Sequence, residues 1–168
     1  LVTDEGRLFC GGGISADLNL SLYLIEKYYG REIALQSSRC TMVDLDRTCQ
    51  SPFVMFTPEK NHADSKVLEA QLRMENNLLD QIDIEDMANE AGVSIRQLNR
   101  RFKAATGVTI NNYLQLVRVD AAKTSLVNTA LSIEEISLNT GYENISFFRR
   151  LFKKQTSLTP SEYRKRFR

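Results

Sequence analysis

The second half of the chain has the spacing of amphipathic helices, with apolar residues every three to four positions from Ala63 onward. Asp, Ser, Thr and Asn are preferred at helix starts and Gly at helix ends, so such residues divide the region into segments. The first predicted helix would bury Val67, Leu68, Leu72 and Leu78-Leu79. Further helices are expected over Ile84–Ala91, Ile95–Ala105 and Thr109–Val127, then from Ser132 to Gly141, from Asn144 to about Gln155, and from Thr159-Pro160 onward.

The longest of these helices separates two shorter pairs. Its inward face would carry Tyr113, Leu114, Val117, Ala121 and Leu126. The helix after it begins with the capping-box pattern of Ser132 and Glu135, and Pro160 suits the first turn of the last helix. Seven helices with short connections indicate a compact all-α unit over residues 61–168.

Residues 1–60 have a different pattern. Arg7–Cys10 is typical of a short strand, and the glycines Gly11–Gly13 follow it. Ser15 would cap a helix that buries Leu18, Leu22 and Ile25 and that ends at Gly30. Residues 37–61 mix short apolar runs with polar residues and proline, which indicates strand fragments or loop. We expect this partial α/β segment to have difficulty in forming a core of its own.

An internal repeat is the strongest signal in the helical half. A shift of fifty residues aligns Phe102–Thr109 with Phe152–Thr159, Arg100 with Arg150 and Tyr113 with Tyr163. A shift of 49 aligns Gly92 with Gly141. Agreement at so many positions indicates two copies of one structural unit.

Each copy is predicted to be a helix, a tight glycine turn and a basic helix, which is the order of a helix-turn-helix unit. The first unit spans about residues 83–105 and the second about 132–155, with the linker helix at about 109–127 between them. One shared apolar face would bury Ile84, Met87, Ala88, Val93, Leu98 and Phe102 in the first unit, and Ile133, Ile136, Tyr142, Phe148, Leu151 and Phe152 in the second. The opposite faces would then present Arg96, Asn99, Arg100 and Lys103, and Asn144, Ser146, Arg149, Arg150 and Lys153.

The distribution of charge supports a nucleic-acid interface in the C-terminal half of the chain and not in the N-terminal half. The whole chain has a net charge of +1, but residues 1–79 hold 8 basic and 11 acidic residues, a net charge of −3. Residues 80–168 hold 14 basic and 10 acidic residues, a net charge of +4. The basic excess is concentrated in Arg96–Lys103, Arg149–Lys154 and Arg164–Arg168. This asymmetry is typical of a basic binding module joined to another segment.

The remaining composition excludes several other classes of protein. No apolar stretch approaches the roughly 18 residues of a membrane span. Three cysteines without paired spacing favour reduced thiols in the cytoplasm over a disulfide framework. The first residue is Leu1, and we expect the sequence to begin inside a longer protein.

The helical half resembles the AraC/XylS family of bacterial transcription regulators over about residues 64–168. The resemblance rests on Ser94, Leu98, Arg100, Phe102-Lys103, Gly107, Tyr113, Arg118, Ala122, Leu126, Ile136, Gly141-Tyr142, Phe148-Arg149, Phe152-Lys153, Thr159-Pro160 and Tyr163-Arg164. It implies that the family's base-reading positions are occupied here by Arg96, Asn99, Arg100, Ile145, Ser146 and Arg150. Ser157 stands where the family commonly has Gly, and Ser137 where it commonly has Ala, which predicts local adjustment only.

Part of the front segment resembles a second domain type. Arg7–Leu20 and Gly30–Ala34 are similar to the end of the class I glutamine-amidotransferase-like domain of one AraC subgroup. That likeness implies a sensor and dimerisation role for a complete domain, of which residues 1–60 would be the C-terminal tail. This tail is expected to be poorly ordered or paired with another chain through exposed strand edges.

Three patterns in the sequence could indicate catalysis or ligand binding, and each also has a purely structural explanation. Cys10 before the glycines could be a nucleophile with His62 as its base, although a buried cysteine is the commoner reason for such a residue. Gly11–Gly13 could cradle phosphate, but the segment lacks the spacing and the lysine of known phosphate loops, which favours close backbone packing. His62 and Asp64 have no third metal ligand in view and read as capping and surface residues.

The sequence therefore predicts a mainly α protein: a seven-helix DNA-binding domain with two helix-turn-helix units joined by a long helix, preceded by a partial α/β segment. The predicted function is sequence-specific recognition of double-stranded DNA by a cytoplasmic, non-enzymatic transcription regulator without cofactor or metal. Phosphate contacts are expected from Ser94, Lys103, Asn144, Arg149, Lys153 and Lys154. Expected partners besides DNA are RNA polymerase and a second copy bound through the N-terminal segment, with no membrane. The alternative is a fragment of an amidotransferase-like hydrolase whose helical half mediates protein contacts.

The two reading helices are predicted to contribute unequally. The first carries a polar stripe of Arg96, Asn99 and Arg100, whereas the second mixes Ile145 and Phe147 with Ser146 and Arg150. The first copy would therefore specify sequence more, and the second would contribute thymine methyl contacts and anchoring.

Overall fold

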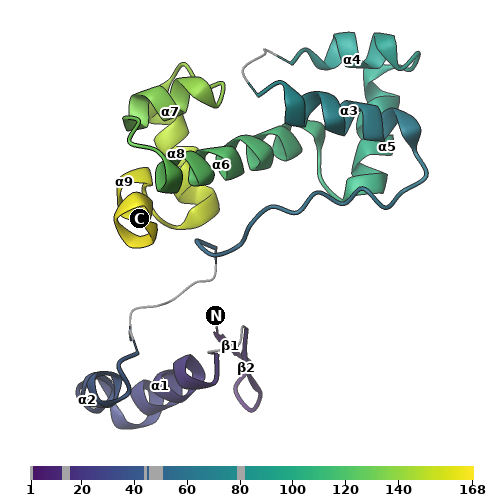
Figure 1. Ribbon diagram of the computed structural model, residues 1–168. Helices are drawn as coiled ribbons and strands as arrows, with labels where there is room; N and C mark the ends of the chain where they lie inside the picture. Colours follow the sequence, from purple (N-terminus) through teal and green to yellow (C-terminus); the bar gives the residue numbers. More distant parts are fainter. Residues whose placement is uncertain (1, 13–15, 44, 46–50, 79–81) are drawn as a thin grey trace. The chain divides into compact units, whose positions relative to one another are not determined.

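The computed structural model of the chain describes residues 2–12, 16–43, 45, 51–78 and 82–168. Two compact units form, residues 1–53 and residues 54–168. Each unit has its own packing. The described part is mostly helical, with one small sheet (Figure 1).

The first unit is a β-hairpin packed on a helix pair. Strand β1 (Val2–Asp4) pairs antiparallel with β2 (Phe9–Gly11), so that Thr3 lies opposite Cys10. Helices α1 (Ala16–Tyr29) and α2 (Arg31–Thr41) follow, separated by Gly30 with a φ of 88°. The buried apolar side chains of this unit are Ala16, Leu22 and Ala34, which agrees with the expectation of a small core.

A carboxylate joins the hairpin to α1. Asp4 accepts hydrogen bonds from the Tyr23 hydroxyl and the Lys27 ammonium, both at 2.5 Å. These bonds lower the pKa of Asp4 to about 2. The unit therefore depends on polar contacts at its surface as well as on its few buried groups.

Helix α2 corrects the interpretation of residues 37–61 as strand fragments or loop, because helix continues through Thr41. Its Glu32, Ala34 and Leu35 favour helix intrinsically, but Ala34 is its one buried residue, so no apolar periodicity marks it. Residues 53–56 carry no strand, so of the two expected alternatives, strand fragments or loop, they follow the second. Ser15, the predicted cap of α1, and Gly13 lie outside the described residues.

The second unit contains the seven helices predicted for the C-terminal half. They are α3 (Ser65–Asn76), α4 (Ile84–Glu90), α5 (Ile95–Thr106), α6 (Ile110–Asn128), α7 (Ile133–Asn139), α8 (Ile145–Thr156) and α9 (Pro160–Phe167). The mainly α fold, with a long helix joining two helix-turn-helix units, is therefore confirmed. The predicted N-caps Asp83, Ser94, Thr109, Ser132, Asn144 and Thr159 all accept a backbone N–H of their helix.

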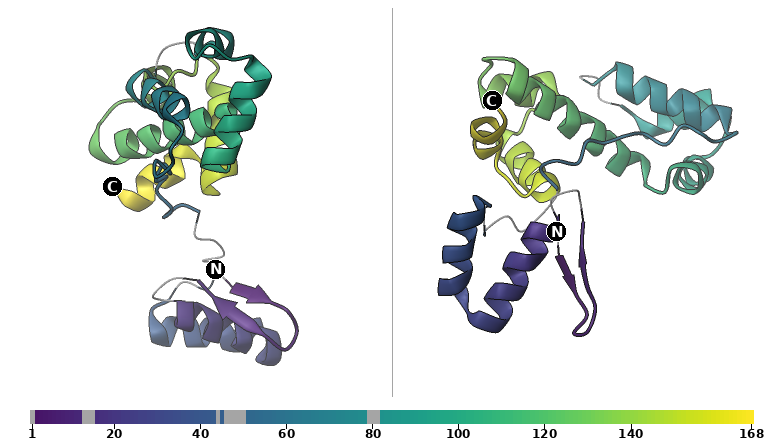
Figure 2. Two further views of the ribbon diagram at one scale, coloured as in Figure 1. Left: turned by 90° about the vertical axis from the view of Figure 1, so that its right-hand side faces the viewer. Right: turned by 60° about the horizontal axis from the view of Figure 1, so that its bottom comes forward.

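Two hydrophobic clusters share α6. The first joins α3, α4 and α5 to the beginning of α6 at Ile110 and Tyr113. The second joins α7, α8 and α9 to the rest of α6 through Val119, Ala122 and Leu126. Figures 1 and 2 show α6 running between the two groups of helices, so this helix is a structural link between the two repeats.

The buried faces of α3 and α6 differ in part from the predicted ones. In α3 the buried residues are Val67, Ala70, Gln71 and Met74, whereas Leu72 is 42% exposed. Leu78 lies beyond the end of α3, and Leu79 is outside the described residues. In α6 the buried residues are Ile110, Tyr113, Val119, Ala122 and Leu126, because the helix turns different faces toward the two clusters in succession.

Residues 54–62, which we call the strap, lie along the second unit. The Phe56 ring meets the Tyr113 ring edge-on at 5.2 Å, and the Phe56 N–H donates to Asp120 at 3.2 Å. Lys123 donates to the carbonyl of Val54 at 2.6 Å. These contacts place the division between the two units at Phe53, ahead of the position 60/61 expected from the sequence.

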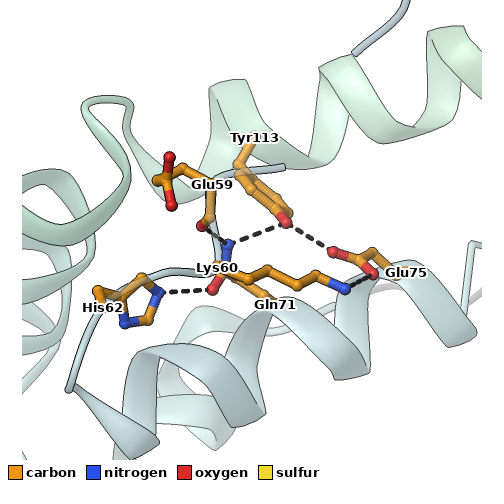
Figure 3. A network of polar contacts seen from close by, with 6 residues as sticks. All are labelled: Glu59, Lys60, His62, Gln71, Glu75 and Tyr113. Carbon is orange, nitrogen blue, oxygen red and sulfur yellow. Dashed lines mark hydrogen bonds and ion pairs between the residues drawn. The ribbon is translucent and has the colours of Figure 1, made fainter. Parts of the chain in front are cut away.

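A polar network fixes the end of the strap (Figure 3). The buried Gln71 amide donates to the Glu59 carbonyl at 2.9 Å and to the Tyr113 hydroxyl at 3.1 Å. Its oxygen lies 2.8 Å from His62 Nε2, so this imidazole nitrogen is the donor. Tyr113 donates to Glu75 at 2.6 Å, and burial raises the pKa of its hydroxyl. A buried amide with every group bonded explains why a glutamine can replace an apolar residue on the inner face of α3.

Candidate nucleic-acid interface

The two predicted turns have matching backbone geometry. Gly92 and Gly141 have φ values of 64° and 80°, in the left-handed region that glycine adopts without steric cost. The residue after each glycine donates back to the preceding helix, Val93 to Ala88 at 3.0 Å and Tyr142 to Ser137 at 2.9 Å. Helices α4 and α5, and α7 and α8, are therefore two copies of one helix-turn-helix arrangement.

Helix α5 separates its apolar and basic residues by face. Leu98 and Phe102 are fully buried, while Arg96, Arg100 and Lys103 are exposed. Asn99 is half-buried, and its amide donates to the Ile95 carbonyl one turn earlier at 3.1 Å. Arg96, Gln97 and Arg100 line a shallow recess on the exposed face. The predicted polar stripe of α5 thus forms one continuous surface of donor groups.

Arg101, next to Arg100, has a different role. Its guanidinium makes a two-point bridge to Asp64, the N-cap of α3, with N–O distances of 2.6 and 2.7 Å. The bridge lowers the pKa of the Asp64 carboxyl and raises that of Arg101. Asp64 also accepts the Val67 N–H at 3.2 Å, which confirms its expected capping role. Arg101 follows the buried Leu98 by three positions, so helical spacing alone places it toward α3.

Helix α8 repeats this division with more apolar surface. Phe148, Leu151, Phe152 and Thr156 are buried, and the exposed residues include Ser146, Arg149, Arg150, Lys153 and Lys154. Ile145 is half-buried. Phe147 remains 41% exposed, with its ring centroid 5.9 Å from that of Tyr142. Burial raises the pKa of Tyr142 to about 12.

The N-cap residues of the two reading helices already use their side chains. Ser94 accepts the Gln97 N–H at 3.2 Å and donates its hydroxyl proton to Gln97 Oε1 at 3.2 Å. Asn144 accepts the Phe147 N–H at 2.9 Å. A phosphate contact from either residue would come beside these caps, where the helix dipole is positive.

Helices α5 and α8 also differ from their neighbours in charge. Neither contains an acidic residue, whereas every other helix of the described residues contains at least one. In α4 and α7 the first turns carry Glu85, Asp86, Glu134 and Glu135. Among the described helices, α5 and α8 are therefore the two that carry basic residues and no carboxylate of their own, which suits an interface with a polyanion.

Two other arginines of the C-terminal half hold the fold together. Arg164 donates to the carbonyls of Leu126 at 3.3 Å and Leu131 at 2.5 Å, and so closes the end of α6. Arg118 donates to the Gly141 carbonyl at 3.2 Å and lies 5.4 Å from the Tyr142 ring centroid. Arg164 thus has a structural task, although the sequence grouped it with the basic clusters.

The positions at which the chain departs from the resembled family pattern are accommodated locally. Ser157 ends α8 with a φ of 61°, the left-handed conformation that Gly107 adopts at the end of α5. Ser137 is buried and donates to the Tyr142 carbonyl at 2.8 Å, across the turn of the second unit.

The catalytic and ligand-binding patterns gain no support from the described residues. Cys10 is exposed on β2, and His62 is engaged with Gln71 in the strap network. A Cβ on Gly11 would lie 2.8 Å from the Ala16 side chain, which explains this glycine by close packing. No group of three or more His, Cys, Asp or Glu in the described residues could hold a metal ion. No helix in the described part is both long and apolar enough to span a membrane.

Comparison with known proteins finds similar sequences for the same region. Residues 87–166 match a model described as a helix-turn-helix domain. An uncharacterized HTH-type transcriptional regulator from the cgkA 5' region of Pseudoalteromonas carrageenovora is 38% identical over 101 residues, 60% of each chain. The xylose operon regulatory protein of Escherichia coli is 32% identical over 108 residues, which cover 64% of this chain and 28% of that protein. The chain therefore spans about a quarter to three fifths of these two relatives, and both are named as regulators.

Solved structures give the same result for the fold. The DNA-binding domain of AdpA, a global transcriptional factor solved with a target DNA, has a TM-score of 0.59 and 28% identity. The match covers 61% of this chain and 93% of that domain. An AraC-type DNA-binding domain protein from Chromobacterium violaceum has a TM-score of 0.57 and 32% identity over 61% and 91% of the two chains.

Proposed function

We propose that the protein is a sequence-specific, double-stranded DNA-binding transcription regulator, because residues 87–166 match a helix-turn-helix domain model and the helical unit is similar in fold to AraC-type DNA-binding domains. One observation carries this proposal. Helices α5 and α8 are acid-free and follow glycine turns of the same geometry, and apart from Arg101, which is bridged to Asp64, their basic residues are exposed. A helix of this kind fits the major groove, where donor side chains meet base acceptors and phosphates.

Base reading is assigned to one face of each reading helix. On α5 it comprises Arg96, Asn99 and Arg100, and on α8 it comprises Ile145, Ser146 and Arg150. Arginine donates two parallel hydrogen bonds to guanine, and isoleucine suits a thymine methyl group. The half-buried state of Ile145 and the exposure of Phe147 support a more apolar readout by α8.

Phosphate contacts are assigned to the residues that flank these faces, namely Ser94, Lys103, Asn144, Arg149, Lys153 and Lys154. The four basic residues among them are exposed and are free to follow the DNA backbone. Each phosphate neutralised releases counterions, so the affinity should fall steeply as salt rises. The first helix would then contribute more of the specificity and the second more of the anchoring.

The rest of the proposal concerns the whole protein. Residues 1–60 would be the tail of an amidotransferase-like sensor domain in a longer bacterial, cytoplasmic regulator. The hairpin edge and exposed apolar residues such as Leu8, Tyr28 and Tyr29 would suit pairing with a second copy through this segment. RNA polymerase would be the partner through which DNA binding alters transcription.

Selection of binding sites from a random duplex pool tests the proposal directly. Purified chain should enrich a pair of short motifs about one DNA turn apart. Gel shifts with the enriched duplex, repeated over a salt series, should show affinity falling linearly on logarithmic axes. If no sequence is enriched and no duplex gives a salt-sensitive gel shift, the protein is not a sequence-specific DNA-binding protein.

A further inference from the structure

Capping boxes begin three helices of the described residues, and one of them differs in charge. In α7 and α9 the third helical residue, which closes the box, is Glu135 or Glu162. In α5 the same place is taken by the neutral Gln97. The cap holds the pKa of Glu135 and of Glu162 below its usual range, so a glutamate at 97 would be ionised in the same setting.

The capping bonds also fix the direction of the Gln97 amide. Its oxygen accepts the Ser94 N–H at 3.0 Å and the Ser94 hydroxyl at 3.2 Å. The reverse amide orientation would bring two donors together, so the oxygen must face the cap. The side-chain NH2 group then points away from the cap, and no acceptor for it is found among the described residues.

Gln97 lines the recess together with Arg96 and Arg100. All three side chains carry N–H donors, and no carboxylate is among the lining residues. A surface made of donors alone is complementary to hydrogen-bond acceptors. DNA presents such acceptors as guanine N7 and O6 and thymine O4 in the major groove, and as phosphate oxygens along its backbone.

We propose that Gln97 is a further DNA-contacting residue, which caps α5 through its amide oxygen and donates to a DNA acceptor through its amide nitrogen. Gln97 combines two requirements that a glutamate cannot meet at this position. It closes the capping box, and it keeps negative charge away from the approaching phosphates. This inference rests on the proposed DNA-binding function and adds a residue to those already assigned to DNA contact.

Two substitutions separate capping from contact. Gln97→Glu keeps the capping oxygen, removes the donor and adds a charge. Gln97→Met keeps the length and helix propensity of the side chain and adds no charge, but it removes the capping oxygen together with the donor, so the fall in its thermal midpoint measures the loss of the cap. Glu135→Gln is the matched control, because it makes the reverse exchange in the capping box of α7, which reads no DNA in this proposal.

The measurement is the dissociation constant for the selected duplex and for a random duplex at two salt concentrations, with the thermal midpoint of each variant. Gln97→Met should lose about three- to tenfold in affinity for the selected duplex with an unchanged salt slope. Gln97→Glu should lose more, with a thermal midpoint no lower than that of the original chain. Glu135→Gln should remain within about twofold.

The outcomes distinguish the possible sources of the contact. A loss confined to the selected duplex places the acceptor on a base, and an equal loss on random duplex places it on phosphate. If the original chain binds and both Gln97 variants bind with unchanged affinity, Gln97 has only a capping role and the inference is wrong. If only Gln97→Glu loses affinity, the donor assignment is wrong, because the added negative charge would then account for the whole loss. If the original chain binds no duplex, the proposed function itself fails.

Discussion

Two adjacent arginines of α5 differ in what surrounds them. Arg100 is exposed in the donor recess, whereas the Arg101 guanidinium is held by both carboxylate oxygens of Asp64. Sequence composition treats the pair as one basic cluster, yet helical spacing turns the two side chains toward different neighbours. One residue is therefore available to a ligand, and the other joins α5 to the start of α3.

Arg100→Ala should weaken binding to the selected duplex by about 1–3 kcal/mol and relax the preference at one base pair. The reason is that an exposed arginine is truncated without disturbing a packed contact. Arg101→Ala is the matched control, because it should reduce the free energy of unfolding by at most about 1 kcal/mol and leave base preference unchanged. Equal losses of Arg100→Ala on selected and random duplex would contradict base reading by Arg100.

The Asp64 carboxylate makes stability depend on acid pH. Its folded-state pKa is lowered below the ordinary 3.8 by Arg101 and by backbone N–H groups. Such a group stabilises the fold fully above the unfolded value, and this contribution is lost as pH falls below about 3.8 through the lowered folded value. Asp64→Asn keeps a capping acceptor and removes the titrating charge. Urea unfolding at about pH 6 and pH 3 should therefore show a smaller acid loss in the variant than in the original chain. If the variant and the original chain lose the same amount of stability at acid pH, Asp64 does not contribute to the acid response.

At the scale of elements, helix boundaries in residues 82–168 could be predicted because caps and terminators are local signals. Ser94, Thr109, Ser132 and Thr159 each bond within their own helix start, so their effect needs no knowledge of distant residues. The internal repeat supports these boundaries further, because a matching signal occurs at the aligned position of the other copy. The base- and phosphate-contact residues assigned to α5 and α8 stay predictions, although their elements and exposure are now defined.

Features that depend on tertiary neighbours could not be predicted in the same way. Gln71 faces inward because Glu59, His62 and Tyr113 satisfy its amide, and no local pattern indicates those partners. Leu72 is exposed on the same helix for the converse reason. The N-terminal elements were harder still, since α2 buries a single alanine and so lacks the periodicity on which a sequence prediction depends.

The turn of the second helix-turn-helix unit should be less tolerant of substitution than the end of α5. Gly141 and Gly107 both have positive φ, at 80° and 77°, but their surroundings differ. A Cβ at Gly107 would meet nothing within 4 Å, whereas a Cβ at Gly141 would collide with the Leu78 carbonyl and lie 2.7 Å from the Arg118 guanidinium. The strain of positive φ is common to both positions, so the collision should decide the difference.

Gly107→Ala should therefore reduce the free energy of unfolding by about 1–2 kcal/mol, from backbone strain alone. Gly141→Ala should cost roughly 2–4 kcal/mol, because overpacking adds to the same strain. Chemical denaturation of the two variants side by side measures the difference. Equal midpoints would mean that the Leu78 and Arg118 groups move aside without cost, and that the contact of this turn with α6 is loose.

For the whole helical unit, α6 determines how the two reading helices are combined. Its 19 residues span about 28 Å at 1.5 Å per residue, close to the roughly 34 Å of one DNA turn. Both hydrophobic clusters pack on it, the first at Ile110 and Tyr113 and the second from Val119 to Leu126. One chain with this link can present two reading helices to successive grooves, a task that single helix-turn-helix proteins accomplish as dimers.

A fixed link makes the spacing of the two half-sites a property of the fold. Inserting five base pairs between the selected motifs turns the second motif to the opposite face of the duplex, and inserting ten restores the face but adds about 34 Å. Since α6 is packed at both ends, neither insertion can be followed by the protein. Both should reduce affinity at least about tenfold, toward that of a single motif. Competition gel shifts with the three duplexes measure this, and a duplex with one scrambled motif gives the reference value. Recovery of full affinity with the ten-base-pair insertion would show that the two helix-turn-helix units move independently or that separate chains occupy the two motifs.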